Sequence, residues 1–179
     1  MENPMAAVFR LAALSLASLA TGCATPGSSD PATRTVILES RSGSNVTGTL
    51  QLRDSAAGLH IQGEVRGLQP NSEHGFHIHE TGDCSAADAA SAGGHFNPGG
   101  APHGHAGSDP HHAGDMPNIH AGADGVAKVN QVVVGVTLAA GANSVAARAL
   151  IVHRDPDDYR SQPAGNAGPR IACGVIPAR

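Results

Sequence analysis

The sequence predicts an all-β domain, folded as an antiparallel sandwich or barrel of about eight short strands. Short apolar segments alternate with turn residues, and no segment shows a sustained helical period flanked by caps. Glycine and proline number 23 and 12 among the 179 residues, so turns are frequent. Aromatic residues make up 2 %, which leaves valine, isoleucine, leucine and alanine to build the core.

Four apolar segments form the first half of the predicted sheet. Residues 45–53 and 58–67 alternate apolar with polar residues, as strands with one buried face do. Residues 54–58 (DSAAG) supply the turn between them. The other two strands are expected at 35–38 and 75–80.

The second half of the sheet follows a long interruption. Residues 81–124 and 154–169 carry no apolar periodicity. Irregular segments of this length occur in compact domains mainly where they are functional or pinned. Strand character returns in residues 125–129, 131–138, 144–153 and 170–176.

The N-terminal segment has the features of an export signal. Arg10 precedes an apolar run at 11–20, which is too short to span a bilayer but suits a secretory signal peptide. The small residues that end in Cys23 resemble a bacterial lipobox, in which this cysteine is lipidated. Ala20 stands where that motif usually has leucine, so plain secretion stays open.

The chain therefore divides into three expected parts. They are a lipoprotein-type signal peptide at 1–22, a flexible tether at 23–33 and a single domain at 34–179. We expect the protein in the periplasm or cell envelope, with the membrane reached only through a lipid on Cys23.

Two cysteines remain once Cys23 is assigned to the lipid. An even pair in an exported chain predicts a disulfide between Cys84 and Cys173, with two free buried thiols as the alternative. Closing so long a loop is worth up to about 4–5 kcal/mol in the chain-entropy model.

The charge balance excludes one class of partner. The formal net charge is −4, with acidic and basic residues mixed along the chain. A nucleic-acid-binding protein would need a basic face, so we expect no nucleic-acid partner. An anionic substrate would have to be attracted by a local positive group.

Histidines concentrate in one part of the chain, which spans the predicted strand at 75–80 and most of the irregular segment after it. Nine of the 11 histidines lie between His74 and His120, where lysine and arginine are almost absent. Neutral imidazole is the commonest protein ligand for zinc and copper, so this density predicts a metal site. His77 and His79 are two apart on a predicted strand, and their side chains therefore project from one face.

Five sequence blocks, taken in order, resemble the copper, zinc superoxide dismutase family in its bacterial, exported form. The blocks are residues 75–80 (GFHIHE), 94–98 (GHFNP), 112–115 (HAGD), 150–153 (LIVH) and 165–176 (GNAGPRIACGVI). The resemblance extends from about residue 35 to the end of the chain. It implies an immunoglobulin-like, eight-stranded antiparallel Greek-key barrel or sandwich with long metal-binding and electrostatic loops.

The resemblance implies two metal sites that share one bridging histidine. The implied copper ligands are His77, His79, His95 and His153. The implied zinc ligands are His95, His103, His112 and Asp115. Four imidazoles suit Cu(II), whereas three nitrogens and one carboxylate oxygen suit tetrahedral zinc.

The two zinc histidines in the loop each have a rival. His105 lies two residues from His103, and His111 adjoins His112; the motif match favours His103 and His112. We expect the rivals and His120 to be exposed or to collect metal. His74 is expected to bond to the backbone beside the site.

Three features outside the ligand set bear on catalysis. The resemblance implies that Arg170 attracts superoxide near the copper, with a surface ion-pairing arginine as the alternative. It also implies that Asp157 links a copper histidine to a zinc histidine, with Asp158 as its rival. Pro163 and Ala164 stand where the family often has lysine and threonine, so the steering charges depart from the family pattern.

The implied function is the dismutation of superoxide to dioxygen and hydrogen peroxide, protecting the cell envelope. Arg170 and His95 are the implied catalytic residues, with copper and structural zinc as cofactors. The alternative is a non-catalytic envelope protein that buffers copper or zinc. The extra histidines from His103 to His120 favour it slightly, whereas the intact matches at all four copper positions and at Arg170 count against it. A zinc hydrolase would need an open zinc position, which the matched ligand set lacks. A homodimer is compatible with the sequence, in which interface strands and core strands look alike.

Overall fold

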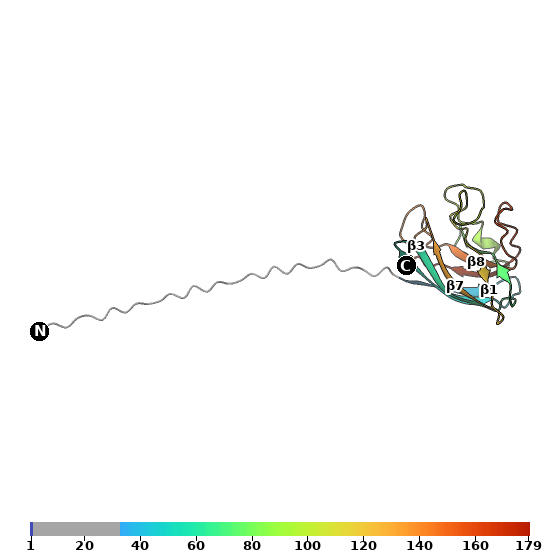
Figure 1. Ribbon diagram of the computed structural model, residues 1–179, viewed down its shortest axis with the longest axis horizontal. Helices are drawn as coiled ribbons and strands as arrows, with labels where there is room; N and C mark the ends of the chain where they lie inside the picture. Colours follow the sequence, from blue (N-terminus) through green and yellow to red (C-terminus); the bar gives the residue numbers. More distant parts are fainter. Residues whose placement is uncertain (2–32) are drawn as a thin grey trace.

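The computed structural model describes Met1 and residues 33–179, which fold into β-strands and loops (Figure 1). Within these residues the helical structure is one 3₁₀ turn, η1 (Ala90–Ala92). No helix in this part of the chain is long and apolar enough to cross a membrane. The expected signal peptide, almost all of the tether, and Cys23 lie outside the described residues.

Seven strands form one curled antiparallel sheet, in the order β5-β8-β9-β1-β2-β3-β7, and β4 pairs with β6 in a separate ribbon. The strands are β1 (Arg34–Ser40), β2 (Thr47–Ser55), β3 (Gly58–Arg66), β4 (Glu73–His74), β5 (Phe76–His79), β6 (Ile119–His120), β7 (Val126–Val133), β8 (Ala149–His153) and β9 (Arg170–Val175). The prediction of an all-β barrel or sandwich is therefore confirmed.

Strand β1 joins the two halves of the sheet. Its residues Arg34 to Leu38 pair with β2, whereas Glu39 and Ser40 pair with β9. A strand that changes partners along its length lets the sheet turn a corner and close over a core. In Figure 1 the yellow-green and red-brown long loops lie together at one side of this curled sheet.

The core is aliphatic, as the composition requires. Strand β2 alternates exposed and buried residues, with Leu50 and Leu52 fully buried, and β3 buries Leu59, Ile61 and Val65 in the same way. Each such side chain contributes about 1.5–3 kcal/mol on burial. Strand β5 is buried along its whole length, so its histidines lie inside the protein.

Two expected strands are wrong in their extent. Residues 125–129 and 131–138 were expected as separate strands, but β7 is continuous and ends at Val133. Its partner β3 begins at Gly58, and Leu59 opposite Val133 is the last paired position, so no ladder exists beyond it. The Asp54 carboxylate accepts hydrogen bonds from the Leu138 amide and the Thr137 hydroxyl instead.

The strand expected at residues 144–153 also begins later, at Ala149. Ala147 has a φ of 58°, in the left-handed region that does not continue a strand. The Ala147 amide donates to the Ile176 carbonyl, so this turn is tied to the segment after β9.

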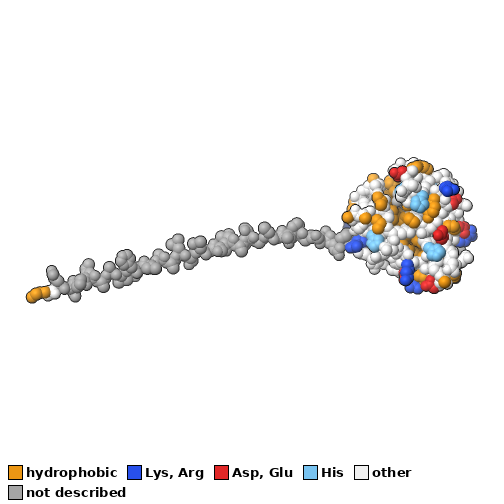
Figure 2. Space-filling model, viewed as in Figure 1, with side chains coloured by type: hydrophobic (Ala, Val, Ile, Leu, Met, Phe, Trp, Pro, Cys, Tyr) orange, Lys and Arg blue, Asp and Glu red, His pale blue; other side chains and the backbone are white. Residues whose placement is uncertain are grey.

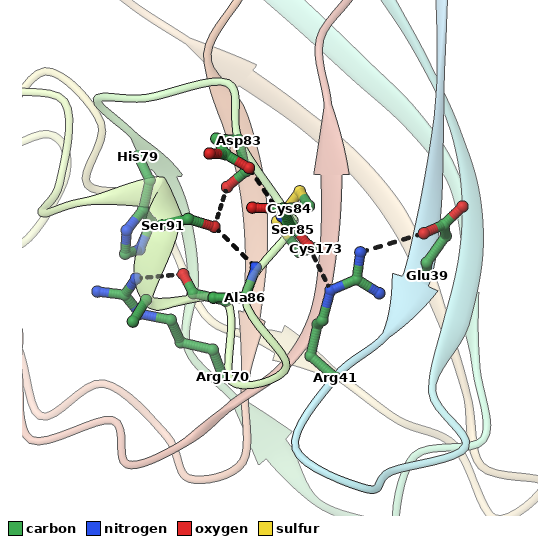
Figure 3. Close-up of a disulfide and its surroundings, with 12 residues drawn as sticks. Glu39, Arg41, His79, Asp83, Cys84, Ser85, Ala86, Ser91, Arg170 and Cys173 are labelled. Carbon is green, nitrogen blue, oxygen red and sulfur yellow. Dashed lines mark hydrogen bonds and ion pairs between the residues drawn. A yellow bond between two sulfur atoms is a disulfide. The ribbon is translucent and has the colours of Figure 1, made fainter.

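The predicted disulfide between Cys84 and Cys173 is present, with Cα atoms 5.8 Å apart. It ties the loop after β5 to the middle of β9 (Figure 3). Arg41, after the end of β1, donates from Nε to the Cys84 carbonyl at 2.9 Å. Three segments far apart in sequence are thus joined beside the histidine cluster.

Candidate metal centre

Two groups of potential metal ligands lie side by side and share His95. All their ligand atoms lie within 4.8 Å of one another in each group. The first group is His77, His79, His95 and His153, and the second is His95, His103, His112 and Asp115, all of them buried. Among the described residues these are the sets of three or more His, Cys, Asp or Glu side chains that could hold a metal ion.

Strand pairing builds the first group. His77 and His79 project from β5, whose neighbour β8 runs antiparallel with Ile151 opposite His77. This register places His153, at the end of β8, next to the start of β5. The His153 amide donates to the Gly75 carbonyl at 2.8 Å, which secures that position.

Each histidine of the first group has one ring nitrogen bonded and one left over. His79 Nδ1 donates to the Gly93 carbonyl at 2.9 Å, and His153 Nδ1 donates to the Gly168 carbonyl at 3.1 Å. In this group the buried nitrogens without a hydrogen-bond partner among the described residues are Nδ1 of His77 and Nε2 of His79, His95 and His153. Because an unpaired buried polar atom costs about 1–3 kcal/mol, four converging ones fit a bound metal ion.

The second group converges on one carboxylate oxygen. Asp115 Oδ1 lies 2.7 Å from His95 Nδ1, 3.0 Å from His103 Nδ1 and 3.3 Å from His112 Nδ1. Its other oxygen accepts from the amides of Gly104 and His112. Three imidazole nitrogens and one oriented carboxylate match the donor set of a closed tetrahedral zinc site.

Asp115 remains a carboxylate although it is buried. Burial alone raises the pKa of its carboxyl group, but hydrogen bonds from His95 and from the Gly104 and His112 amides outweigh it. The net effect holds the pKa well below its ordinary value. A buried anion is therefore available to a cation at any physiological pH.

Asp157 connects the two groups. Its Oδ2 accepts from His77 Nε2 at 2.8 Å, and its Oδ1 accepts from His103 Nε2 at 3.0 Å. These bonds turn Nδ1 of each ring toward its ligand group. The rival Asp158 is exposed and accepts from the backbone of Arg160 and Ser161.

Sequence reasoning missed the residues that hold Asp157 and His103. Asn118 bonds to both the amide and the carbonyl of Asp157, at 2.9 and 3.0 Å. Gln162 does the same for His103, at 2.9 and 2.8 Å. A Cβ atom on Gly165 would lie 1.7 Å from Asp157 Oδ1, so only glycine fits there. Asn118 and Gln162 act across long sequence separations, and no local pattern marks them. Gly165 opens the last of the five sequence blocks, but its contact with Asp157 is seen only in the fold.

Arg170 is half-buried at the start of β9, and both terminal nitrogens of its guanidinium group donate to backbone carbonyls. Nη1 donates to the Ala89 carbonyl at 2.6 Å, and Nη2 donates to the Gly93 carbonyl at 2.7 Å. Burial lowers the pKa of Arg170 below the usual value of an arginine, opposed by the charge of Asp88, and the group stays cationic at neutral pH. On the face shown in Figure 2, basic and acidic side chains are interspersed.

A hollow lies beside His153 of the first group. A hollow of about 250 Å³ is lined by His153 and by residues of the last long loop, including Ser161, Pro163 and Asn166. Its lining carries no lysine or arginine. The departure noted in the sequence at Pro163 and Ala164 therefore falls on the wall of this hollow.

The remaining histidines stay outside both groups. His74 Nδ1 donates to the His153 carbonyl at 2.9 Å, beside the site. His111 Nδ1 donates to the His112 carbonyl, and the ring of His105 packs against Tyr159. His120 and His60 lie on strands, with His120 exposed and His60 bonded to Asn130.

Three histidines of the first group, His77, His79 and His153, resist protonation. Burial, and then the neighbouring histidines, lowers the pKa of His77 and of His79 well below 6.5. Burial also lowers the pKa of His153 to about 4, against the raising effect of the Gly168 carbonyl. These rings are neutral at physiological pH, which is the form that binds metals.

The metal-free protein is expected to lose stability as the pH falls from about 6.5 toward 4. In this window the unfolded chain takes up protons on these histidines and the folded protein does not, so the free energy of unfolding rises with pH. Each such histidine contributes a slope of up to about 1.4 kcal/mol per pH unit. Denaturant unfolding of the chelator-treated protein measures this, and a flat profile between these pH values would contradict it.

Comparison with known proteins gives one consistent result. The family model of "Copper/zinc superoxide dismutase (SODC)" matches residues 46–176. Cu-Zn superoxide dismutase 2 of Aquifex aeolicus (strain VF5) is 47 % identical over 135 residues, which cover 73 % of this chain and 79 % of that protein. The extracellular Cu-Zn superoxide dismutase of Brugia pahangi is 40 % identical over 154 residues, 81 % of this chain and 75 % of that protein.

Solved structures agree with this result. The crystal structure of a SOD-like protein from Bacillus subtilis has a TM-score of 0.73 and 38 % sequence identity, and covers 80 % of this chain and 97 % of that chain. The structure of the clock protein EA4 has a TM-score of 0.74 and 33 % identity, covering 86 % and 98 %.

Proposed function

Because the chain belongs to the copper/zinc superoxide dismutase family, we propose that its buried histidine centre converts superoxide to dioxygen and hydrogen peroxide. Two superoxide anions and two protons give one molecule of each product. The observation that carries the proposal is the pair of buried ligand groups joined at His95. Copper and zinc are its cofactors.

The donor atoms support one assignment of the two metals. His77, His79, His95 and His153, with four free ring nitrogens, would hold copper. His95, His103, His112 and Asp115 would hold zinc. When bound, copper supplies one-electron redox chemistry toward superoxide, and zinc supplies a fixed charge that holds His95.

The residues around the metals have separate tasks in this proposal. Arg170 attracts superoxide and donates hydrogen bonds to it from a guanidinium group already anchored by two carbonyls. His95 Nε2, which has no hydrogen-bond partner among the described residues, holds and releases a proton, while its Nδ1 faces the zinc group. Asp157 keeps His77 and His103 in the tautomer that both sites need.

Metal-loaded activity tests the proposal. Protein loaded with copper and zinc is expected to dismutate superoxide well above an equal concentration of free copper, and zinc-only protein is expected to be inactive. Activity no higher than that of free copper would sink the enzymatic proposal. The buffering alternative gains no support from the described residues, in which His105, His111 and His120 join neither ligand group.

Replacing Arg170 with glutamine is expected to lower kcat/KM about ten-fold or more and to flatten its dependence on ionic strength. The variant keeps a hydrogen-bonding side chain but loses the charge that attracts the anion. Pulse radiolysis at several salt concentrations measures both effects. Arg66→Gln removes the same charge from an exposed ion pair on β3 and serves as the control. An unchanged salt dependence in Arg170→Gln would refute the steering role.

Export to the cell envelope is part of the proposal. The apolar run at 11–20, the small residues before Cys23 and the relative named as extracellular support it. The finer proposal is a periplasmic enzyme anchored by lipid on Cys23. Mass analysis of the mature N-terminus in a bacterial host is the test: an acylated Cys23 supports the anchor, and an unmodified terminus refutes it.

A further inference from the structure

One carbonyl group holds both a copper-group histidine and the substrate-guiding arginine. The Gly93 oxygen accepts from His79 Nδ1 at 2.9 Å and from Arg170 Nη2 at 2.7 Å. The direction of this carbonyl therefore affects the ring of His79 and the guanidinium of Arg170 together. The direction of the carbonyl is in turn set by the orientation of the Gly93–Gly94 peptide bond.

That peptide bond is held from its other side by Glu80. The Gly93 carbonyl and the Gly94 amide belong to one planar unit, with the C=O and N–H pointing in opposite directions. Glu80 Oε1 accepts from the Gly94 N–H at 2.9 Å. Because the unit is rigid, a bond that fixes the N–H also fixes the carbonyl that faces His79 and Arg170.

The carboxylate also strengthens the carbonyl as an acceptor. A hydrogen bond to a charged group polarises the peptide, and linked hydrogen bonds reinforce one another. Glu80 is close to the whole unit, since a Cβ atom on Gly93 would lie 2.5 Å from its Oε1. Gly93 has a φ of 72°, so this position requires glycine on conformational grounds as well.

Glu80 itself is held by its backbone. Its amide donates to the Gly94 carbonyl at 2.9 Å, so both the main chain and the side chain of Glu80 form hydrogen bonds with Gly94. Arg148 donates from Nη1 to the Glu80 carbonyl. The Arg148 guanidinium lies over the ring of Phe96, 4.8 Å from its centroid, which ties this support to the residue after His95.

We propose that Glu80 is a positioning residue, which orients and polarises the Gly93–Gly94 peptide so that Arg170 and His79 keep their working geometry. The inference rests on the proposed function, because it assigns copper to His79 and anion binding to Arg170. Glu80 is exposed and touches neither metal group, so its contribution passes through this peptide.

The test compares Glu80→Ala with Glu80→Gln in the full protein loaded with copper and zinc. Azide, a small anion that ligates copper, is titrated and followed by its charge-transfer absorption. Loss of the bond in Glu80→Ala is expected to weaken azide binding about three- to ten-fold and to shift the copper absorption band. Glutamine still offers an oxygen to the Gly94 amide but lacks the charge that polarises the peptide, so Glu80→Gln is expected to weaken azide binding by no more than about two-fold.

Asp124→Ala is the matched control. Asp124 is an exposed carboxylate that accepts from the Val126 amide at 3.1 Å, in a turn between β6 and β7. Asp124→Ala removes one negative charge and one hydrogen bond to a backbone amide, as Glu80→Ala does, but at a position outside the ligand groups. Azide affinity and the copper band are expected to stay at wild-type values in this variant.

Two results would overturn the inference. One is wild-type azide affinity in Glu80→Ala; the other is equal weakening in Glu80→Ala and Glu80→Gln, which would assign the effect to charge alone. If Glu80→Ala does not fold, Glu80→Asp, whose carboxylate is one methylene shorter, takes its place and is expected to weaken azide binding. Failure of the proposed function would instead appear as a wild-type protein that binds azide normally but does not dismutate superoxide.

Discussion

Replacing His153 with alanine is expected to abolish superoxide dismutation, by a factor of at least about 100, while zinc is still taken up. His153 belongs to the copper group alone, and its Nε2 is one of the four free nitrogens that converge there. Loss of a residue that merely orients a ligand typically costs about 10–100-fold, and loss of a ligand itself should cost more. The zinc group keeps all four of its members in this variant.

The measurement is metal content together with activity after loading with copper and zinc. The His153→Ala protein should hold zinc and lose tight copper. His60→Ala is the control, because His60 is a histidine on β3 that bonds to Asn130 and joins neither group. Retention of substantial activity in His153→Ala would show that copper is not held by this set of ligands.

Replacing Cys84 and Cys173 together with serine is expected to lower the free energy of unfolding of the metal-free protein by about 4 kcal/mol. The cross-link joins residues 89 positions apart, and restricting so long a loop in the unfolded chain is the source of the effect. Ala89 and Gly93, which anchor Arg170, lie in the loop that this bond ties to β9. Activity of the loaded variant is therefore expected to fall as well.

Denaturant unfolding at neutral pH measures this change. Ser91→Ala is the control for loosening the loop without cutting the cross-link. The Ser91 hydroxyl donates to the Asp83 carbonyl at 3.0 Å and accepts from the Ala86 amide at 3.1 Å. Figure 3 draws both bonds. Loss of this hydroxyl is expected to cost about 1 kcal/mol. A loss below about 1 kcal/mol in the double cysteine variant would contradict the prediction.

Local pattern was sufficient where the structure depends on neighbours in sequence. The alternation in residues 45–53 and 58–67 predicted β2 and β3 nearly to their ends, because period-two patterning places one face of a strand in the core. The pattern failed at residues 134–138, where apolar residues continue but β3 offers no partner beyond Leu59. A strand exists only where a neighbour accepts its hydrogen bonds, and that depends on the length of another segment.

The sequence by itself determined the all-β class, the clustering of histidines and the shared face of His77 and His79, because each follows from composition or from a spacing of two on a strand. Only the tertiary structure decided which carboxylate serves both ligand groups. Asp157 and Asp158 are adjacent in the chain, yet only Asp157 lies within bonding distance of His77 and His103. The roles of Glu80 and Asn118 were likewise decided by folding, because a hydrogen bond depends on distance in space and not on distance along the chain.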